Sequence, residues 1–309
     1  MAQDRPFLGI LLMLGFCVAA PLGDSMAKLL GDTVPVAQLV TVRFVIQALL
    51  LAPFLALGLA LPRGTRILGL IALRTVLHIA GIGMMFLALT YLPVAEAIAI
   101  AFVMPFIMLL LGWAVLGEEV GMRRLAACAV GFAGTLMVVQ PTFAEVGPPA
   151  LLPLGVAVVF ALFMLTTRTV AKAVDPIALQ LVSGVMASAV LLPVTALGWA
   201  AGWAPLVPVM PTAGDLWLLA ALGVLGTLAH LLMTWSLRFA PAATLAPMQY
   251  LEIPVATLVG WAIFRDLPDG LAAAGICVTV AAGLYIVLRE RALTRPSAPP
   301  PPRPAPPAV

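Results

Sequence analysis

Charged residues are scarce in this chain of 309 residues. Asp, Glu, Lys and Arg together make up 9% of the sequence, hydrophobic residues make up 63%, and the mean hydropathy is +1.15. Because roughly a quarter of the residues in a soluble domain are charged, this composition excludes a soluble fold and predicts a chain embedded in a lipid bilayer. The net charge of +3 is interpreted as a sign of membrane topology, and we expect no nucleic-acid partner.

Cysteine and catalytic motifs are scarce as well. Cys17, Cys128 and Cys277 lie in apolar segments without C-x-x-C spacing, which excludes a disulfide framework and a zinc site. The sequence contains no P-loop, HExxH or GxSxG motif and no cluster of metal ligands. We therefore expect no enzyme activity, no bound metal and no cofactor.

Long apolar stretches, in contrast, are abundant. A bilayer core needs about 20 apolar residues per helix, and charged or Gly/Pro-rich breaks divide the chain into ten such stretches. The first stretch is expected to be a retained helix and not a signal peptide. The ten predicted spans are 7–30, 35–61, 67–90, 93–116, 122–140, 151–173, 176–198, 215–239, 241–264 and 270–288.

Basic residues sort to one side of this arrangement. With a cytoplasmic N-terminus, twelve Lys and Arg residues fall on the cytoplasmic side and Arg265 alone falls on the other. Because this bias follows the positive-inside rule, we expect a multi-pass protein of the cytoplasmic (inner) membrane with both termini in the cytoplasm. The proline-rich residues 289–309 are expected to form a disordered cytoplasmic tail.

The two halves of the chain repeat each other at an offset of 148 residues. Residues 84–119 and 232–267 align without a gap and share eight identities, including Pro93 with Pro241 and a Gly-Trp-Ala run in each half. Since each half holds an odd number of spans, the second copy must enter the membrane from the opposite side. The predicted fold is therefore an all-α integral membrane protein of ten helices, in two inverted five-helix repeats at 7–140 and 151–288.

Small residues recur every four positions in the fifth and tenth predicted spans. Such faces let two helices approach closely. They join helices within one chain or join two chains, so a homodimer remains open. The positions, which match at the same offset, are Ala127, Gly131 and Thr135 in the fifth span and Gly275, Thr279 and Gly283 in the tenth.

The fourth and fifth spans carry a series of recognisable motifs. An Ala-Leu-x-Tyr-Leu-Pro segment leads into a proline-bearing helix, a Leu-Gly-Glu turn, an Arg and a glycine-rich helix, at positions Ala88–Pro93, Pro105, Leu116–Glu118, Arg123, and Gly131 with Gly134. This series resembles the EamA repeat of the drug/metabolite transporter superfamily. The second half is similar but less complete, with Phe264-Arg265-Asp266 in place of Leu-Gly-Glu.

This resemblance covers about residues 8–288 and implies a secondary transporter of a small organic metabolite. It also implies a central cavity formed by the first four helices of each repeat, with the fifth and tenth helices at the periphery. Asp24-x-x-x-Lys28, followed by Gln38 and Arg43, resembles a branch that includes proposed riboflavin importers and S-adenosylmethionine carriers. Riboflavin or a similar planar metabolite is thus one expected substrate, and export of amino acids, metallophores or drugs is the alternative.

Two other classes of protein compete with a transporter. A membrane enzyme or accessory subunit needs catalytic polar residues clustered at one interface, and a passive channel needs rings of like charge or a filter-like glycine run. Neither pattern occurs in the sequence. The sequence therefore favours secondary active transport by alternating access, driven by protons or by the solute gradient.

Ionisable side chains inside a bilayer are costly unless they are paired or hydrated, so each one in a span is a candidate site residue. We expect Asp24, Lys28, Arg43 and Glu96, in the outer half of the bundle, to form an external gate or an anion and zwitterion site. The structural alternative pairs Asp24 with Lys28 at i, i+4 and Arg43 with Glu96. The set is Asp24, Lys28, Arg43 and Glu96 in the outer half, and Arg74, His78, His230 and Glu252 elsewhere.

Arg74 and His78 share one face of the third span. They are expected to bind a phosphate or carboxylate, or to relay protons. The alternative is that Arg74 snorkels to the headgroups and His78 bonds a backbone carbonyl.

Glu252 is expected in the middle of the ninth span, after Gln249 and Tyr250. Because burial in lipid favours the neutral form of a lone carboxyl, Glu252 is interpreted as a proton or substrate-amine site. Its alternative role is a protonated carboxyl that holds two helices together. Trp235 and Tyr250 are expected to stack on a planar ring of the substrate.

Overall fold

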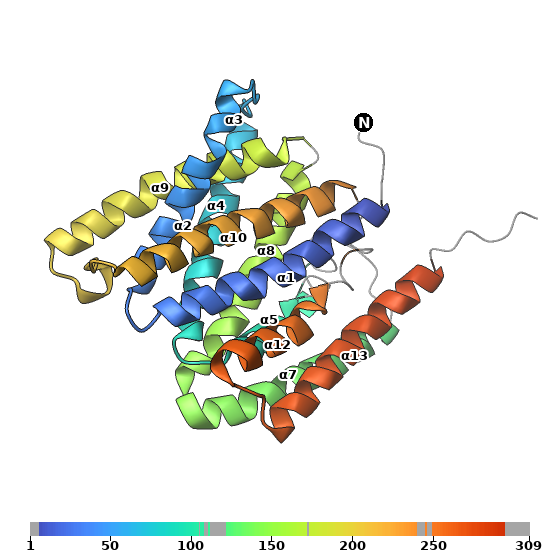
Figure 1. The fold of residues 1–309 in the computed structure, drawn as a ribbon. Helices are drawn as coiled ribbons and strands as arrows, with labels where there is room; N and C mark the ends of the chain where they lie inside the picture. The colour runs from blue at the N-terminus through green and yellow to red at the C-terminus, as the bar shows by residue number, and fades with distance from the viewer. Residues whose placement is uncertain are drawn as a thin grey trace, which may run out of the picture.

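The described part of the chain is helical throughout (Figure 1). The computed structural model describes residues 6–104, 106–107, 111, 122–171, 173–239, 245 and 249–293, and no strand occurs among them. The main helices are α1 (Pro6–Leu30), α2 (Val36–Leu51), α3 (Pro53–Ala56), α4 (Thr65–Leu89), α5 (Val94–Ala101), α7 (Met122–Val146), α8 (Leu152–Ala171), α9 (Pro176–Ala200), α10 (Ala213–Phe239), α12 (Glu252–Phe264) and α13 (Gly270–Leu293).

Seven helical segments in the described ranges are long and apolar enough to cross a membrane. They overlap seven of the predicted spans, and an all-helical membrane fold is thus confirmed. Two further apolar stretches are shorter, namely α12 and the part Gly270–Ala282 of α13. Part of the predicted fourth span, 93–116, lies outside the described residues, as do Pro105, Leu116–Glu118 and the tail beyond residue 293.

The second predicted span, 35–61, ends earlier than expected. Helix α2 continues through Ala52 into α3, and the helical segment stops at Ala56. Gly58 follows with a φ of 85°, a left-handed conformation that glycine adopts without steric cost and that commonly follows a helix end. The apolar residues from Leu57 to Leu61 therefore form a loop and not a last helical turn.

Two helices are interrupted at matching positions of the sequence repeat. After α5 the chain turns at Phe102 and Val103, and before α12 it turns at Tyr250 and Leu251, 148 residues later. The rings of Phe102 and Tyr250 contact each other, with centroids 5.3 Å apart. Glu252, expected in mid-helix, is therefore the first residue of α12.

The sequence around Glu252 explains this helix start. Pro254 lies in the first turn of α12, where backbone N–H groups have no partner within the helix. Proline therefore costs no helical hydrogen bond there, whereas in mid-helix it breaks one.

Helices α7 and α13 pack against each other at the edge of the bundle (Figure 1). A Cβ atom on Gly275 would lie 2.6 Å from the carbonyl oxygen of Gly134, and one on Gly134 would lie 2.7 Å from Oγ1 of Thr279. The glycines of these two faces therefore bring α7 and α13 together within one chain. The side chains of Ala127 and Gly283 lie outside the described part.

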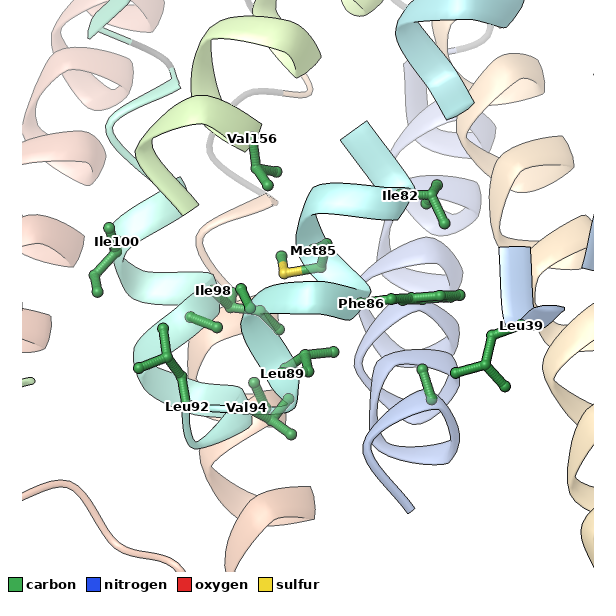
Figure 2. Close-up of a cluster of buried hydrophobic side chains, with 14 of the residues drawn as sticks. Leu39, Ile82, Met85, Phe86, Leu89, Leu92, Val94, Ile98, Ile100 and Val156 are labelled. Atoms are coloured by element: carbon green, nitrogen blue, oxygen red, sulfur yellow. The ribbon is translucent and has the colours of Figure 1, made fainter. Parts of the chain in front are cut away.

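A large apolar cluster packs around the α4–α5 connection, near the end of α1 (Figure 2). Met85, Phe86 and Leu89 of α4 meet Val94 and Ile98 of α5, and all five are buried. Because lipid is as apolar as these side chains, the cluster gains mainly from close packing. It fixes α5 beside α1 and α4, and so positions the interruption at Phe102.

Candidate functional site

A cavity lies at the centre of the bundle. Its atom-free space is about 870 Å³, part of it open to the outside, and the centres of water molecules can reach about 90 Å³ of it. That is room for several waters, at roughly 10–15 Å³ each. The lining comes from α1, α2, α4, α5, α8, α10 and α12 with the two helix interruptions, and α7 and α13 contribute no described lining residue.

Five polar residues interrupt an otherwise apolar wall: Asp24, Arg43, His230, Gln249 and Glu252. They come from α1, α2, α10 and the segment that leads into α12. Of the residues predicted from the sequence, Asp24, Arg43, Gln249 and Glu252 are thus brought to one cavity. His230 is a fifth member to which the sequence assigned no role.

Arg43 is held against α10 by neutral groups. The side chain is only 2% exposed, and its Nη2 donates to the carbonyl oxygen of Gly226 at 3.3 Å. The guanidinium also lies over the ring of Phe44, 5.0 Å from its centroid. Arg43 does not bond Glu96, so the structural alternative for Arg43 is wrong.

His230 contacts both of these groups through one ring nitrogen. Its Nδ1 lies 3.0 Å from Nη2 of Arg43 and 3.0 Å from the carbonyl oxygen of Gly226. An arginine can only donate and a carbonyl oxygen can only accept, so Nδ1 makes one of these two hydrogen bonds at a time. With the imidazole proton on Nε2, Nδ1 accepts from Arg43; with the proton on Nδ1, it donates to Gly226.

Two carboxyl groups face the same cavity from different helices. The charge of Asp24 acts on both Arg43 and Glu252, so Asp24 is near both groups. No hydrogen bond from another described residue to either carboxylate is present. Both acids are half-buried and line the cavity, where water or a solute can reach them.

Arg74 and His78 lie behind the cavity wall, and both are 0% exposed. Arg74 donates from Nε to Thr167 at 2.9 Å and from Nη1 to Ser183 at 3.0 Å, and it lies 4.5 Å from the centroid of Phe163. Arg74 therefore does not snorkel, because hydroxyl groups of α8 and α9 hold it inside the bundle.

His78 packs among rings. Its centroid lies 4.2 Å from that of His230, 5.0 Å from that of Phe44 and 4.8 Å from that of Phe163. Neither ring nitrogen has a hydrogen-bond partner among the described residues, so the expected bond to a backbone carbonyl is absent there. Arg74 is thus connected to Arg43 by successive contacts through Phe163, His78 and His230.

A layer of polar side chains joins α2, α9 and α10 beside His230. Gln47 donates to the backbone oxygen of Gln180 at 2.8 Å, and Gln180 donates to the backbone oxygen of His230 at 3.0 Å and to Thr234 at 3.1 Å. All three side chains that form the layer, Gln47, Gln180 and Thr234, are fully buried. Hydrogen bonds between polar groups, and not apolar contacts alone, thus join these helices beside the cavity.

Lys28 lies away from the cavity. Its Nζ donates to Oδ2 of Asp266 at 3.2 Å and to the backbone oxygen of Leu92 at 3.1 Å, and it lies 4.9 Å from the centroid of Phe264. The expected i, i+4 pair with Asp24 is therefore wrong. Lys28 instead ties the end of α1 to the loop between α12 and α13.

Glu96 also lies outside the cavity lining. Its Oε2 accepts a hydrogen bond of 2.7 Å from Thr142 of α7. The expected outer group of two anions and two cations is thus split, because Glu96 and Lys28 serve helix contacts while Asp24 and Arg43 face the cavity.

The aromatic wall differs from the expected one. Trp235 packs beside Leu51, Leu181 and Leu231, and Tyr250 belongs to the apolar cluster of α4 and α5. Neither lines the cavity. The rings that do are Phe16, Phe86, Phe102 and Phe160, with the methionines Met85, Met104, Met164 and Met233 beside them.

His230 and its surroundings carry the part of the site that sequence reasoning missed. His230 is an ionisable residue within a span, which made it a candidate, but it shares no helix face with another candidate. Its partner is brought by Gly226, one turn earlier on α10. Gly226 and His230 lie four residues apart and face the buried Arg43. This spacing indicates a site only when the packing of α2 on α10 is known.

The fold and this cavity define a multi-pass, all-helical membrane protein. The described residues contain no group of three or more His, Cys, Asp and Glu side chains that could hold a metal ion. The polar lining can bind charges of both signs, and the aromatic and methionine wall can contact a planar ring.

Comparison with known proteins identifies the family. The model of the EamA-like transporter family matches residues 7–140 and 148–289, so this chain belongs to that family of the drug/metabolite transporter superfamily. It is 31% identical over 218 residues to a riboflavin transporter of Rhizobium johnstonii, covering 70% of this chain and 69% of that one.

Two further matches span nearly the whole chain. An S-adenosylmethionine uptake transporter of Rickettsia prowazekii is 24% identical and covers 92% of this chain and 93% of its own. A solved crystal structure is 20% identical, with a TM-score of 0.63 over 94% of this chain and 98% of that one, a likeness that concerns the fold alone.

Proposed function

We propose that this protein is a secondary active transporter that moves a small organic metabolite across the cytoplasmic (inner) membrane by alternating access. The observation that carries the proposal is the central cavity, where Asp24, Arg43, His230 and Glu252 meet inside an apolar bundle. Buried ionisable groups are costly in a membrane and mark solute or ion pathways. The family of transporters to which the chain belongs supports the same function.

We further propose ten helices in two inverted repeats, with both termini cytoplasmic. The interruptions after α5 and before α12 support the repeat, because they lie at the same offset of 148 residues and both border the cavity. Interrupted helices at the repeat interface are typical of transporter sites. The positive-inside bias of the sequence supports the orientation.

In this proposal the polar layers behind the cavity form the closed gate. Arg74 with Thr167 and Ser183, and Gln47 with Gln180, join α2, α4, α8 and α9. Hydrogen bonds between polar groups can break and re-form as helices shift. When hydrogen bonds to water replace these bonds, a cavity that was open to one side of the membrane becomes open to the other side.

The substrate is proposed to contain a planar ring. Four phenylalanines and four methionines line the cavity, and such walls suit flat aromatic groups. Riboflavin is one candidate, since relatives bear that name. S-adenosylmethionine, which has a purine ring and charges of both signs, is a second, and the acids and the arginine of the cavity favour it.

Transport by the purified protein tests the proposal. Proteoliposomes are incubated with a cell metabolite extract supplemented with riboflavin and S-adenosylmethionine, with and without a proton gradient, and their contents are measured by mass spectrometry. We expect time-dependent accumulation of at least one small metabolite relative to protein-free vesicles. Equal contents in both kinds of vesicle contradict the transport function.

The direction and substrate are tested in cells. Expression in a riboflavin auxotroph at low external riboflavin restores growth if riboflavin is imported. Failure to grow, despite membrane expression, removes riboflavin import and leaves S-adenosylmethionine uptake or export of another metabolite to be read from the vesicle contents.

A further inference from the structure

We propose that the cavity selects a zwitterion, with the carboxylate of the solute on Arg43 and His230 and its ammonium group on Glu252 and Asp24. The proposal rests on the transport function above and names the class of its substrate. It is supported by polar side chains at two places on the cavity wall that lack a partner among the described residues.

The anion end of the site has two nitrogen atoms without hydrogen-bond partners. Nη1 of Arg43 and Nε2 of His230 have no partner among the described residues, and both side chains line the cavity. Nη1 is always a donor, and Nε2 is a second donor in the tautomer in which Nδ1 accepts from Arg43. Leaving charged donors unpaired in a buried site is costly, and a carboxylate, which accepts from two donors at once, removes that cost.

The two side chains that carry these unpaired nitrogens are held in place by the rest of the wall. Nη2 of Arg43 and Nδ1 of His230 lie 3.0 Å apart, and both lie beside the oxygen of Gly226. Gln180 in turn donates to the backbone oxygen of His230. The donors are therefore preorganised, and binding an anion requires little ordering of side chains.

The cation end is formed by the second carboxyl group. Asp24 acts electrostatically on Arg43, and these two charges offset each other. Glu252 has Asp24 as its charged neighbour and no Lys or Arg among the described residues in an ion pair with it. Within the described part of the chain Glu252 thus has no positive partner, and an ammonium group of the solute is the complementary charge.

The two ends come from different helices, and Asp24 acts electrostatically on both. Arg43 and His230 come from α2 and α10, while Glu252 begins α12 beside Gln249. A neutral ring compound leaves the donors and Glu252 unpaired, a simple anion leaves Glu252, and a simple amine leaves the donors. Only a zwitterion satisfies both ends, and its apolar part can then contact Phe102 and Phe160 of the wall.

Three probes with one ring and different charges test this assignment. Tryptophan is a zwitterion, tryptamine is its amine without the carboxylate, and indole-3-propionate is its carboxylate without the amine. The thermal unfolding of the detergent-solubilised full chain is followed at constant ionic strength with increasing amounts of each probe, since a ligand of the native state stabilises it. We expect tryptophan to bind more tightly than tryptamine and more tightly than indole-3-propionate, because each of these two probes leaves one end of the site unpaired.

Variants assign the two ends. A charge-assisted hydrogen bond changes affinity by about tenfold or more, so Arg43→Gln is expected to remove the preference for tryptophan over tryptamine without weakening tryptamine. Glu252→Gln is expected to weaken tryptophan and tryptamine by about tenfold and to leave indole-3-propionate unchanged. Arg168→Gln, at an exposed position of α8, is the matched control because it also removes a cation. It should change the binding of none of the three probes.

Equal stabilisation by the three probes, preference for indole-3-propionate, or stabilisation by none of them overturns the zwitterion site. A loss of tryptamine binding in Arg43→Gln as large as that of tryptophan overturns the assignment of the anion end. Binding is measured without transport, so vesicle uptake with no charge preference contradicts this inference alone. Charge-selective binding without uptake of any metabolite contradicts the transport function alone.

Discussion

The guanidinium of Arg43 occupies the space in which a side chain at position 226 would lie. A Cβ atom on Gly226 would be 2.6 Å from Nε and 3.1 Å from Cζ of Arg43, and the carbonyl oxygen of Gly226 accepts from Nη2 of the same arginine at 3.3 Å. Glycine thus lets the arginine lie flat against α10, where it meets His230. The close approach of α2 and α10 at this point sets the anion end of the cavity.

Gly226→Ala is therefore expected to displace Arg43 and to impair solute binding. Overpacking costs about 1–3 kcal/mol, against which alanine regains up to about 1 kcal/mol of helix propensity. We expect a lower unfolding temperature and at least about a tenfold loss of transport, equivalent to about 1.4 kcal/mol. Thermal unfolding and vesicle uptake of the variant measure the two effects.

Two glycines of the same helix are controls for Gly226. In Gly214→Ala the new Cβ atom would meet only Oγ1 of Thr212, at 3.7 Å, so this variant should leave stability and binding unchanged. In Gly223→Ala the new Cβ atom would lie 2.6 Å from Cβ of Ile46. Gly223→Ala should destabilise the protein without changing its preference for a carboxylate. If Gly226→Ala and Gly223→Ala have the same effect on ligand preference, the special role of the Arg43 contact is contradicted.

Arg74 offers a test that separates stability from transport. The side chain is 0% exposed and bonded to two neutral hydroxyls, and replacing a buried charge by an apolar side chain of similar size is often neutral or stabilising. We expect Arg74→Met to keep or raise the unfolding temperature while transport falls by at least about tenfold, equivalent to about 1.4 kcal/mol. Wild-type transport by Arg74→Met would remove Arg74 from the gate. Arg74→Lys, which keeps the charge but not the planar fork, should be intermediate.

The ion pair of Lys28 with Asp266 is expected to contribute little. The two side chains are 20% and 37% exposed and 3.2 Å apart, and pairs of this kind contribute about 0.2–1 kcal/mol. A double-mutant cycle with Lys28→Gln and Asp266→Asn, measured by unfolding, should give a coupling energy in that range. Transport should stay near the wild-type rate, and a severe loss in Lys28→Gln alone would place Lys28 on the solute path.

Helices α7 and α13 provide a prediction about assembly. Gly275→Ala would bring a Cβ atom to 2.6 Å from the oxygen of Gly134, and overpacking of this kind costs about 1–3 kcal/mol. Gly270→Ala on the same helix meets nothing within 4 Å and is the control. We expect Gly275→Ala to lower the unfolding temperature and to leave the mass of the detergent complex unchanged. A loss of dimer in Gly275→Ala with normal stability would show that this face joins two chains.

The sequence predicted the helical membrane fold well, because the cost of unpaired backbone groups in lipid leaves helices as the simplest solution for apolar stretches. The ends of α1, α4 and α9 lie close to the predicted ones for that reason. The end of the second span was missed because a hydropathy pattern does not separate Gly58 from the apolar residues around it, whereas Gly58 adopts a left-handed conformation. The start of a helix at Glu252 was missed because hydropathy does not register a turn inside an apolar run.

The candidate site was predicted in part. Rarity of charge in lipid was enough to select Asp24, Arg43 and Glu252, which do line the cavity. It could not separate them from Lys28 and Glu96, because those two are satisfied by Asp266 and Thr142, far away in sequence. The partners of a charged residue depend on which helices are neighbours, and the offset repeat does not supply that information.

Counterflow in proteoliposomes tests the central claim most directly. Vesicles that hold wild-type protein, Arg43→Gln or Glu252→Gln at equal density are preloaded with the metabolite that wild-type vesicles accumulate, and uptake of the labelled metabolite is measured over a range of pH. We predict rapid counterflow by the wild type and a loss of at least about tenfold, or about 1.4 kcal/mol, in each variant, with any residual rate of Glu252→Gln independent of pH. Counterflow at the wild-type rate and with the wild-type pH dependence in both variants would contradict the assignment of this cavity as the transport site.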